Sequence, residues 1–325
     1  METIKKNIPG ILLTLAIGMS GFFLNKIIPY VGGITLAIIL GLIIGNIFKL
    51  NRRFEPGVKF SEKNILAYAI MLIGLNLNFN ILTKLGYQSI AIIIFMVFTI
   101  ILISLFVGKL VGISKSFSLL IGVGSAICGS SAIAAVAPMV TKQEEEVGIS
   151  ISVVNLLGIL GIFFMPILAL TLKFNDSLSG LMIGGTLQAV GHVVAAAFSL
   201  NDLVGEFATV VKMGRILMLG PVILLFGFFM RNGDTNRRSG KFILPNYLIG
   251  FIILSIVGTA QILPIELAGF LKLISKILLS TAMAAIGLKI RLESLFRQGP
   301  QALATGAVLF TIQIALMLGI LFILF

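Results

Sequence analysis

Long apolar runs separated by short polar stretches make up almost the whole of this 325-residue chain. A helix needs about 20 apolar residues to cross the roughly 30 Å of hydrocarbon in a bilayer. About eleven runs suit this role, although the fifth and seventh are doubtful as simple spans because glycine and serine interrupt them. Their bounds are 8–24, 28–48, 65–82, 89–111, 117–140, 147–172, 178–200, 207–230, 247–263, 267–288 and 302–325. The pattern predicts an all-α polytopic membrane protein with about eleven transmembrane helices.

The composition agrees with this class. Hydrophobic residues make up 58% of the chain and charged residues 11%, and the mean hydropathy is +1.14. That leaves too little polar surface to cover a soluble globule. The single cysteine, Cys128, excludes an internal disulfide and a thiolate metal cluster. The first apolar run leads directly into a second one, so we expect a retained span and not a cleaved signal peptide.

The net charge of +12 is mostly a signal of orientation. If the N-terminus lies in the cytoplasm, nearly all Lys and Arg residues of the loops are cytoplasmic, and only Lys26, Lys84 and Lys142 lie outside. This asymmetry follows the positive-inside rule. The basic residues are scattered over short loops and not gathered on one soluble face, so no nucleic-acid partner is expected.

One short motif occurs twice, 213 positions apart. The first copy is Ile73-Gly74-Leu75 with Leu82, Lys84, Gly86 and Gln88, and the second is Ile286-Gly287-Leu288 with Leu295, Arg297, Gly299 and Gln301. The predicted spans place the two copies at opposite membrane faces, which indicates inverted repeats of the kind found in secondary transporters. We expect one transporter domain, 1–325, with repeat one at about 28–172 and repeat two at about 178–325. A coincidence between two amphipathic membrane-exit segments is the alternative.

Two stretches are too rich in glycine for ordinary lipid-facing helices, 122–132 and 184–192. Clustered glycines let a helix unwind where protein or water can satisfy the main chain. Such a break leaves a half-helix N-terminus, whose free N–H groups and partial positive charge attract anions. Close helix packing through small residues is the other explanation. The candidate anion ligands in these stretches are Ser125, Gly129, Ser130, Ser131, Thr186, Gln188 and Gly191.

Buried charges predict the sign of the ligand. No Asp or Glu falls inside a predicted span, whereas Lys212 and Arg215 lie about two turns into the 207–230 span and share a helix face. A cation at that depth usually faces a cavity or a partner; snorkelling, or pairing with Glu206, is the alternative. His192 could carry a proton or simply pack. Asn155 could line the cavity or bridge two helices.

Several of these segments resemble a known family. The segments are Leu72-Ile73-Gly74-Leu75-Asn76-Leu77, Gly129-Ser130-Ser131-Ala132, Glu144-Glu145-Glu146, Gln188-Ala189-Val190-Gly191-His192, Lys212-Met213-Gly214-Arg215 and Gly287-Leu288. Across nearly its whole length the chain is similar to the YeiH-type sulfate exporter family of the bile acid/sodium symporter and auxin-efflux carrier superfamily. The resemblance implies a bacterial plasma (inner) membrane protein with a scaffold panel and a core in which two interrupted helices cross. One departure is that the two breaks lie two spans apart instead of five, so either the span count between Val140 and Leu200 is wrong or the second half is rearranged.

The leading hypothesis is a secondary transporter of a small anion, such as sulfate, a sulfonate or a carboxylate, working by alternating access. A channel or a membrane sensor is the alternative. A membrane-embedded enzyme is not expected, because paired Asp residues and a His-rich metal site are both missing from the spans. No cofactor is expected, with Na⁺ or H⁺ as candidate coupling ions. The expected partners are the small anion, the lipid bilayer and a second copy of the chain in a homodimer.

Overall fold

The protein is an all-α, multi-pass membrane protein. Its computed structural model describes residues 2–24, 33–48, 51–76, 79–229, 246–290 and 300–324, and every regular element within them is a helix. Six of the described helices are long and apolar enough to cross a membrane, and three shorter helices are also apolar. The elements are α1 (Glu2–Leu24), α2 (Gly33–Ile47), α3 (Glu55–Phe60), η1 (Ser61–Ile65), α4 (Leu66–Ile73), η2 (Gly74–Asn76), α5 (Phe79–Val111), α6 (Lys115–Ala126), α7 (Ser130–Val140), α8 (Glu144–Thr171), α9 (Asp176–Thr186), α10 (Val190–Phe198), α11 (Asp202–Leu217), α12 (Leu219–Phe229), α13 (Asn246–Thr259), α14 (Ile265–Lys289) and α15 (Pro300–Leu324).

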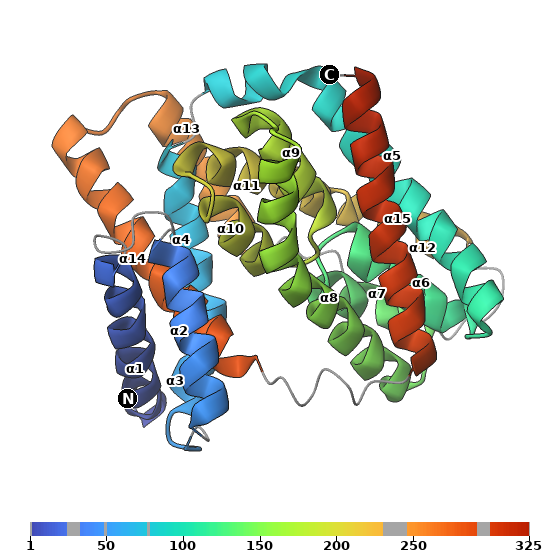
Figure 1. Cartoon of the computed structure of the whole chain (residues 1–325), viewed down its shortest axis with the longest axis horizontal. Coiled ribbons are helices and arrows are strands. Elements are labelled where there is room, and N and C mark those ends of the chain that lie inside the picture. The colour runs from blue at the N-terminus through green and yellow to red at the C-terminus, as the bar shows by residue number, and fades with distance from the viewer. Residues whose placement is uncertain are drawn as a thin grey trace. The chain divides into compact units, whose positions relative to one another are not determined.

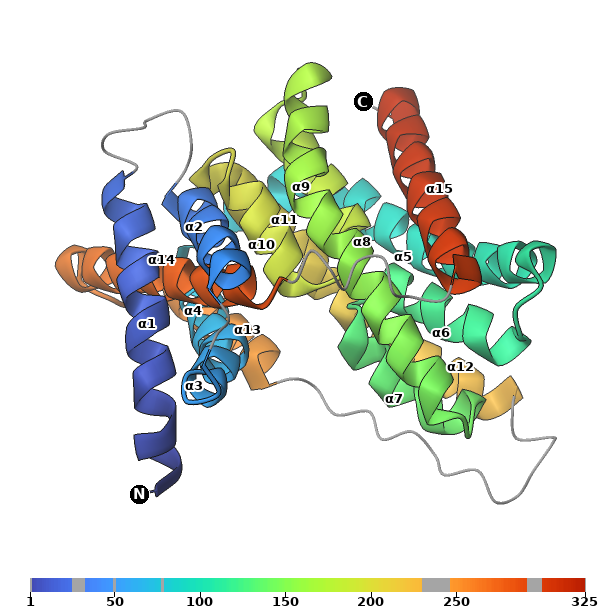
Figure 2. The ribbon, with the colours of Figure 1, turned by 60° about the horizontal axis from the view of Figure 1, so that its bottom comes forward.

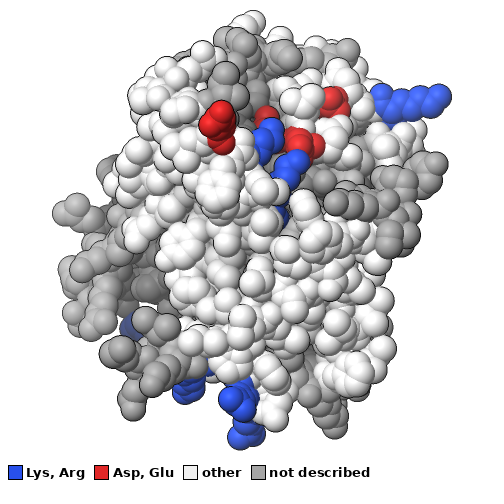
Figure 3. All heavy atoms as spheres, turned by 90° about the vertical axis from the view of Figure 1, so that its left-hand side faces the viewer, with Lys and Arg blue, Asp and Glu red and all other residues white. Residues whose placement is uncertain are grey.

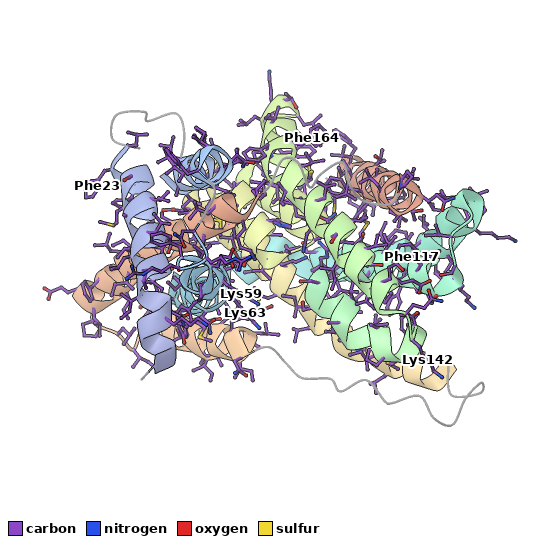
Figure 4. All side chains as sticks on the ribbon, turned by 90° about the horizontal axis from the view of Figure 1, so that it is seen from below. Phe23, Lys59, Lys63, Phe117, Lys142 and Phe164 are labelled. Atoms are coloured by element: carbon purple, nitrogen blue, oxygen red, sulfur yellow. The ribbon has the colours of Figure 1, made fainter. Side chains whose placement is uncertain are left out.

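The surface has the character of a lipid-facing one. One face of the molecule carries its charged side chains toward two opposite edges, with a broad uncharged area between them (Figure 3). Large apolar side chains are exposed elsewhere as well, for example Phe23 and Phe164, which are 53% and 50% exposed (Figure 4). A soluble protein would rarely expose so many apolar side chains together, and a bilayer accounts for them.

The chain forms two compact units, and each takes helices from both halves of the sequence (Figure 1). Unit 1 comprises Met1–Leu82, Phe198–Asp202 and Pro245–Ser294, and unit 2 comprises Thr83–Ala197, Leu203–Leu244 and Leu295–Phe325. Unit 1 thus holds α1 to α4, α13 and α14. Unit 2 holds most of α5, together with α6 to α12 and α15.

In unit 1 the helices approach closely at glycines. A side chain on Gly287 of α14 would collide with the main-chain oxygen of Ile38 on α2, and one on Gly74 of η2 would collide with that of Phe251 on α13. The two contacts are equivalent, because Gly74 and Gly287 are 213 positions apart, as are Ile38 and Phe251. Small residues at such crossings allow the dense packing that holds helices together in membranes.

A second pair of contacts has the same spacing. Gly45 lies against the main chain of Leu288, and Gly258 lies against that of Leu75. Gly45 and Gly258 are again 213 positions apart, and so are Leu75 and Leu288. The spacing of the sequence repeat therefore recurs in the packing of unit 1, with the reciprocal contacts of a two-fold arrangement. Residues 291–299, which contain part of the second sequence copy, lie outside the described residues.

In unit 2 the predicted break at Gly129 is confirmed. Gly129 separates α6 from α7 and has φ +70° and ψ −129°, a conformation that glycine adopts readily. The two half-helices do not continue in one direction. Glu146, in the first turn of α8, accepts hydrogen bonds from Ser114 Oγ at 2.6 Å, beside the start of α6, and from Thr141 Oγ1 at 2.8 Å, beside the end of α7.

One carboxylate can reach both ends of the 115–140 segment only if the segment turns back on itself. We therefore describe α6 and α7 as the first hairpin, and Figures 1 and 2 show its two helices next to α8. The prediction of a span over 117–140 is wrong in this respect. The apolar run is long enough to cross a bilayer, but the turn at Ile127–Gly129 divides it into two half-length helices.

The second glycine-rich segment also turns back. Gly180 of α9 packs against Val204 and Phe207 of α11, and Gly184, one turn later, packs against Ala208 and Val211. The two helices α9 and α11 therefore run in the same direction. Because α9 and α11 are parallel, they begin at the same end of unit 2. The intervening helix α10 ends at Phe198, just before α11 begins at Asp202, so α10 runs back toward the end where α9 started. We call α9 and α10 the second hairpin, and it replaces the span predicted at 178–200. Its break lies at 187–189, so the prediction of a break at Gly191 is wrong: that glycine is in the first turn of α10.

The two hairpins enter unit 2 from opposite ends. The helix α8 has 28 residues and is therefore about 42 Å long, enough to cross a bilayer. The first hairpin has its base at the start of α8, and the second begins at Asp176, shortly after α8 ends. The tips meet, since a Cβ on Gly129 would lie 3.8 Å from the main-chain nitrogen of Ala189. Counting α3 to η2 and α11 to α12 each as one segment, the described chain has nine helical segments besides the two hairpins.

Candidate functional site

Lys212 and Arg215 lie beneath the tips of the two hairpins. Both side chains project from α11, and they are 0% and 1% exposed, the largest fully buried side chains in the described chain. Both are enclosed by protein, and within the described chain all six hydrogen bonds of the two side chains go to main-chain oxygens. Snorkelling and pairing with Glu206 are therefore both excluded as accounts of these two cations.

The Lys212 ammonium bridges the hairpins. Its Nζ donates to the main-chain oxygen of Ile127, in the first hairpin, at 2.7 Å and to that of Leu187, in the second hairpin, at 2.8 Å. Both acceptors lie just beyond the C-terminal end of a half-helix, α6 or α9, where carbonyl groups have no partner within the helix. The lysine therefore satisfies exposed main-chain acceptors of both breaks at once.

Arg215 makes the same connection with more bonds. Its Nε and Nη2 donate to Ala126 O at 2.9 Å and Ser125 O at 2.7 Å, both at the end of α6. Its Nη1 donates to Gly184 O at 3.0 Å and Leu187 O at 2.8 Å, at the end of α9. The planar guanidinium fork can serve four carbonyls from one buried position, which an ammonium cannot do.

The two cations thus lie at the negative ends of two helix dipoles. The C-terminus of a helix carries a partial charge of about −0.5, which favours a nearby cation. Among the described residues neither Lys212 nor Arg215 forms an ion pair with a carboxylate. Their charge is therefore only partly compensated by the protein.

Gln313 of α15 is a third buried polar side chain at this place, and the sequence analysis missed it. Its Nε2 lies 3.4 Å from Ser125 O and 3.3 Å from Gly185 O, again at the ends of α6 and α9, while its Oε1 has no hydrogen-bond partner. The residue is 1% exposed. An isolated amide in the apolar run at 302–325 was the available signal, because such a residue is costly in a membrane unless it is paired.

The predicted ligands of the two glycine-rich stretches surround the tips. Ser130 and Ser131 begin α7, and the hydroxyl of Ser131 lies 2.8 Å from Cys128 Sγ. Gln188 lies in the linker just before α10 and is 0% exposed, yet neither atom of its amide has a partner; the same is true of the Ser125 hydroxyl. Buried polar groups normally find partners, so these groups are available to a ligand.

The first turns of α7 and α10 add donors that face this region. The first N–H groups of any helix have no partner within it, and its N-terminus carries a partial charge of about +0.5. The two N-termini flank the contact between Gly129 and Ala189. Ser131 is exposed and Ser130, Ala189 and Val190 are half-buried, so the tips are partly accessible at the surface of unit 2.

Three other candidates, His192, Asn155 and Gly191, belong to the helices that flank the tips, α8 and α10. His192 is buried in α10 against Gly158 of α8, and its Nδ1 has no partner. Asn155 is half-buried on α8, next to Val154, which contacts Gly129. Gly191 lies beside His192. The structure therefore brings Ser125, Gly129, Ser130, Ser131, Gln188, Lys212 and Arg215 together around the tips, and it places Gly191 and His192 in the first turn of α10 and Asn155 on α8.

Comparison with known proteins identifies relatives but no activity. Residues 9–306 match the model of the family described as conserved hypothetical protein 698. The chain is 33% identical to a UPF0324 membrane protein of Clostridium perfringens, over 97% of this chain and 96% of the relative. It is 36% identical to one of Lactococcus lactis, over 96% and 97%, and 34% identical to one of Bartonella henselae, over 92% and 90%. No solved structure matches the chain.

Proposed function

We propose that this chain, which belongs to the conserved hypothetical protein 698 family of UPF0324 membrane proteins, is a secondary transporter of a small anion. The observation that carries the proposal is the meeting of two opposed re-entrant hairpins above two buried cations. A site between two such tips can be opened toward either membrane face by moving one hairpin at a time. Alternating access needs a site of this kind.

The sign of the ligand rests on the charges around the tips. Lys212 and Arg215 supply two positive charges, and the N-termini of α7 and α10 present N–H donors. The hydroxyls of Ser130 and Ser131 and the amide of Gln188 add neutral donors. An anion is the ligand that all of these groups favour, and sulfate, sulfonates and carboxylates have suitable acceptor oxygens.

We further propose that the transporter domain, 1–325, consists of two inverted repeats, at about 28–172 and about 178–325, with the order of the second one changed. The first repeat runs α2, α4, α5, first hairpin, α8. The 213-residue spacing pairs α2 with α13, α4 with α14 and α5 with α15. The second hairpin and α11, which correspond to the end of the repeat, precede α13 in the chain. This rearrangement explains why the breaks of the two hairpins lie only two predicted spans apart instead of five.

The proposed orientation follows the basic residues. With the N-terminus in the cytoplasm, the first hairpin opens toward the cytoplasm beside Lys115. This proposal moves Lys142, expected outside from the sequence, to the cytoplasmic side, and moves Lys173, expected in the cytoplasm, to the outside. Lys142 is labelled in Figure 4. We place the protein in the bacterial plasma membrane as a member of the YeiH-type exporters, with a homodimer and Na⁺ or H⁺ coupling as further elements of the proposal. We do not propose an enzyme activity.

Flux measurements in proteoliposomes test this function. We expect saturable uptake of one or more labelled anions among sulfate, sulfite, taurine and short dicarboxylates, accelerated by the same anion on the opposite side of the membrane. The Lys272→Gln variant, which changes an exposed basic residue of α14, should behave as the native chain does. Conductance without saturation or acceleration would indicate a channel, and no flux above that of protein-free liposomes would refute the proposal.

A further inference from the structure

We propose that the anion bound at the hairpin tips carries a hydrogen-bond donor of its own, an O–H or N–H group. This inference rests on the proposed function and specifies its substrate class as a small carboxylate or sulfonate with a hydroxyl or amide substituent. It follows from two buried amide side chains at the tips, Gln188 and Gln313, whose oxygens have no hydrogen-bond partner in the described chain.

The orientation of the Gln313 amide is fixed by its neighbours. Its NH₂ group faces two main-chain oxygens, Ser125 O at 3.4 Å and Gly185 O at 3.3 Å. The reverse orientation would place the amide oxygen against two other acceptors, so Oε1 is the atom that points away from them. Because Oε1 and Nε2 are bonded to the same carbon, this oxygen also lies at the ends of α6 and α9. It is an acceptor that the described residues leave unpaired.

Gln188 adds a second acceptor in either orientation of its amide. The side chain lies in the linker between α9 and α10 and is 0% exposed, and neither amide atom has a partner among the described residues. One of the two atoms is a carbonyl oxygen whichever way the amide is turned. The Ser125 hydroxyl, which is also buried and without a partner there, can accept as well as donate. The tips therefore combine unpaired acceptors with the N–H donors of α7 and α10.

These acceptors distinguish one class of anion from another. A buried acceptor has lost its hydrogen bonds to water, and an anion built only of acceptor oxygens brings no donor to replace them. An anion with an O–H or N–H group can place its charged oxygens at the N-termini of α7 and α10 and its donor at the oxygen of Gln188 or Gln313. A site built to bond a donor discriminates strongly against analogues that lack it. An anion with a donor should therefore be preferred to sulfate, which has none at neutral pH.

Binding of matched anions to the full-length protein in detergent tests the inference. Isethionate, which has a hydroxyl group, is compared with ethanesulfonate, and lactate with propionate, at neutral pH and constant ionic strength. We expect the hydroxylated anion of at least one pair to bind about tenfold or more tightly than its partner.

The outcomes separate this inference from the proposed function. If ethanesulfonate and propionate bind as tightly as their hydroxylated partners, or if sulfate binds more tightly than both hydroxylated anions, the inference is overturned but an anion transporter remains. Absence of binding by all of these anions, together with absence of anion flux in proteoliposomes, would refute the proposed function itself.

Variants of the two amides provide the second arm. Gln313→Met keeps the length of the side chain and removes the unpaired oxygen, so it should weaken binding of the hydroxylated anion more than binding of its partner. A residue that only supports the fold would affect both anions alike and leave the ratio of their affinities unchanged. Gln301→Met, at an exposed position at the start of α15, is the control and should keep the native ratio.

An undiminished ratio in both Gln313→Met and Gln188→Met, in proteins that melt like the native chain, would overturn the inference. If neither variant folds, the comparison of matched anions on the native chain still decides the matter.

Discussion

Lys212 and Arg215 share one acceptor, the main-chain oxygen of Leu187, which receives a hydrogen bond of 2.8 Å from each. Each side chain also donates to the other hairpin, Lys212 to Ile127 and Arg215 to Ala126 and Ser125. A single helix, α11, thus holds two hairpins that enter from opposite ends of unit 2. The cations have two roles in this arrangement, because they fix the breaks and supply the positive potential there.

Replacing Arg215 by Lys should weaken both roles. A lysine keeps the charge but has at most three donors for the four carbonyls, and each buried carbonyl left without a partner costs about 1–3 kcal/mol. We expect a lower melting temperature in detergent and a large fall in anion flux. Lys272→Arg, at an exposed position, is the control. Native melting and native flux in Arg215→Lys would show that the fork is dispensable.

The sequence predicted the cations well but not their partners. The spacing of Lys212 and Arg215, three residues apart in a span without acids, was enough to indicate one buried face. Their acceptors are main-chain oxygens, and any residue type supplies these, so no side-chain pattern marks Ala126 or Leu187. Gln313, in contrast, does have a signal in the sequence, because a lone amide stands out in an apolar run. It was missed because nothing in the sequence connects α15 with the breaks.

The sequence indicated a break in each glycine-rich stretch, but it misplaced the second break at Gly191 and did not show that the chain turns back at either. Gly129, with φ +70°, lies where glycine density suggested it. The run at 117–140 has the length and hydropathy of a crossing helix, so composition alone cannot distinguish a crossing from a return. The distinction depends on Glu146, a residue outside the run that bonds to both of its ends.

The re-entrant hairpins predict which positions share a side of the membrane. In a Cys128→Ser background, which has no other cysteine, single cysteines would replace the exposed residues Lys115, Lys142, Lys173 and Asn201. An impermeant maleimide should label the first two from one side of sealed vesicles and the last two from the other. Labelling of positions 115 and 142 from opposite sides would mean that the segment crosses the bilayer.

Glu146 should be more important for stability than its neighbour. Its carboxylate accepts three hydroxyl hydrogen bonds, from Ser114 at 2.6 Å, Ser116 at 2.9 Å and Thr141 at 2.8 Å. In Glu146→Gln one oxygen becomes an NH₂ group that cannot accept, and bonds to a charged acceptor, worth about 1.5–3 kcal/mol each, are lost or weakened. We expect a clear fall in melting temperature. The exposed Glu145→Gln is the control, and equal stability of the two variants would contradict the role of Glu146 in closing the first hairpin.

Gly129 should tolerate alanine poorly for a reason that concerns the backbone. A Cβ there would meet Ala189 only at ordinary contact distance, but the φ of +70° is unfavourable for any L side chain, at a cost of about 1–3 kcal/mol. Gly148→Ala in α8 is the matched control, since it has open space and helical geometry. Thermal unfolding should show Gly129→Ala destabilised and Gly148→Ala unchanged or slightly more stable. Similar melting temperatures for the two variants would show that the positive φ at position 129 does not require glycine.

The equivalence of Gly74 and Gly287 provides a test of the repeat that does not depend on transport. Added methyl groups at these positions would collide with the main-chain oxygens of Phe251 and Ile38, respectively, and backbone cannot move aside as a flexible side chain can. Overpacking of this kind typically costs about 1–3 kcal/mol. If the two contacts are related by the 213-residue repeat, Gly74→Ala and Gly287→Ala should lower the melting temperature by similar amounts. Gly269→Ala, in α14 with no atom near its Cβ, should leave it unchanged. A large effect at one position with none at the other would show that the two crossings are not equivalent, and would remove the structural support for an inverted repeat in unit 1.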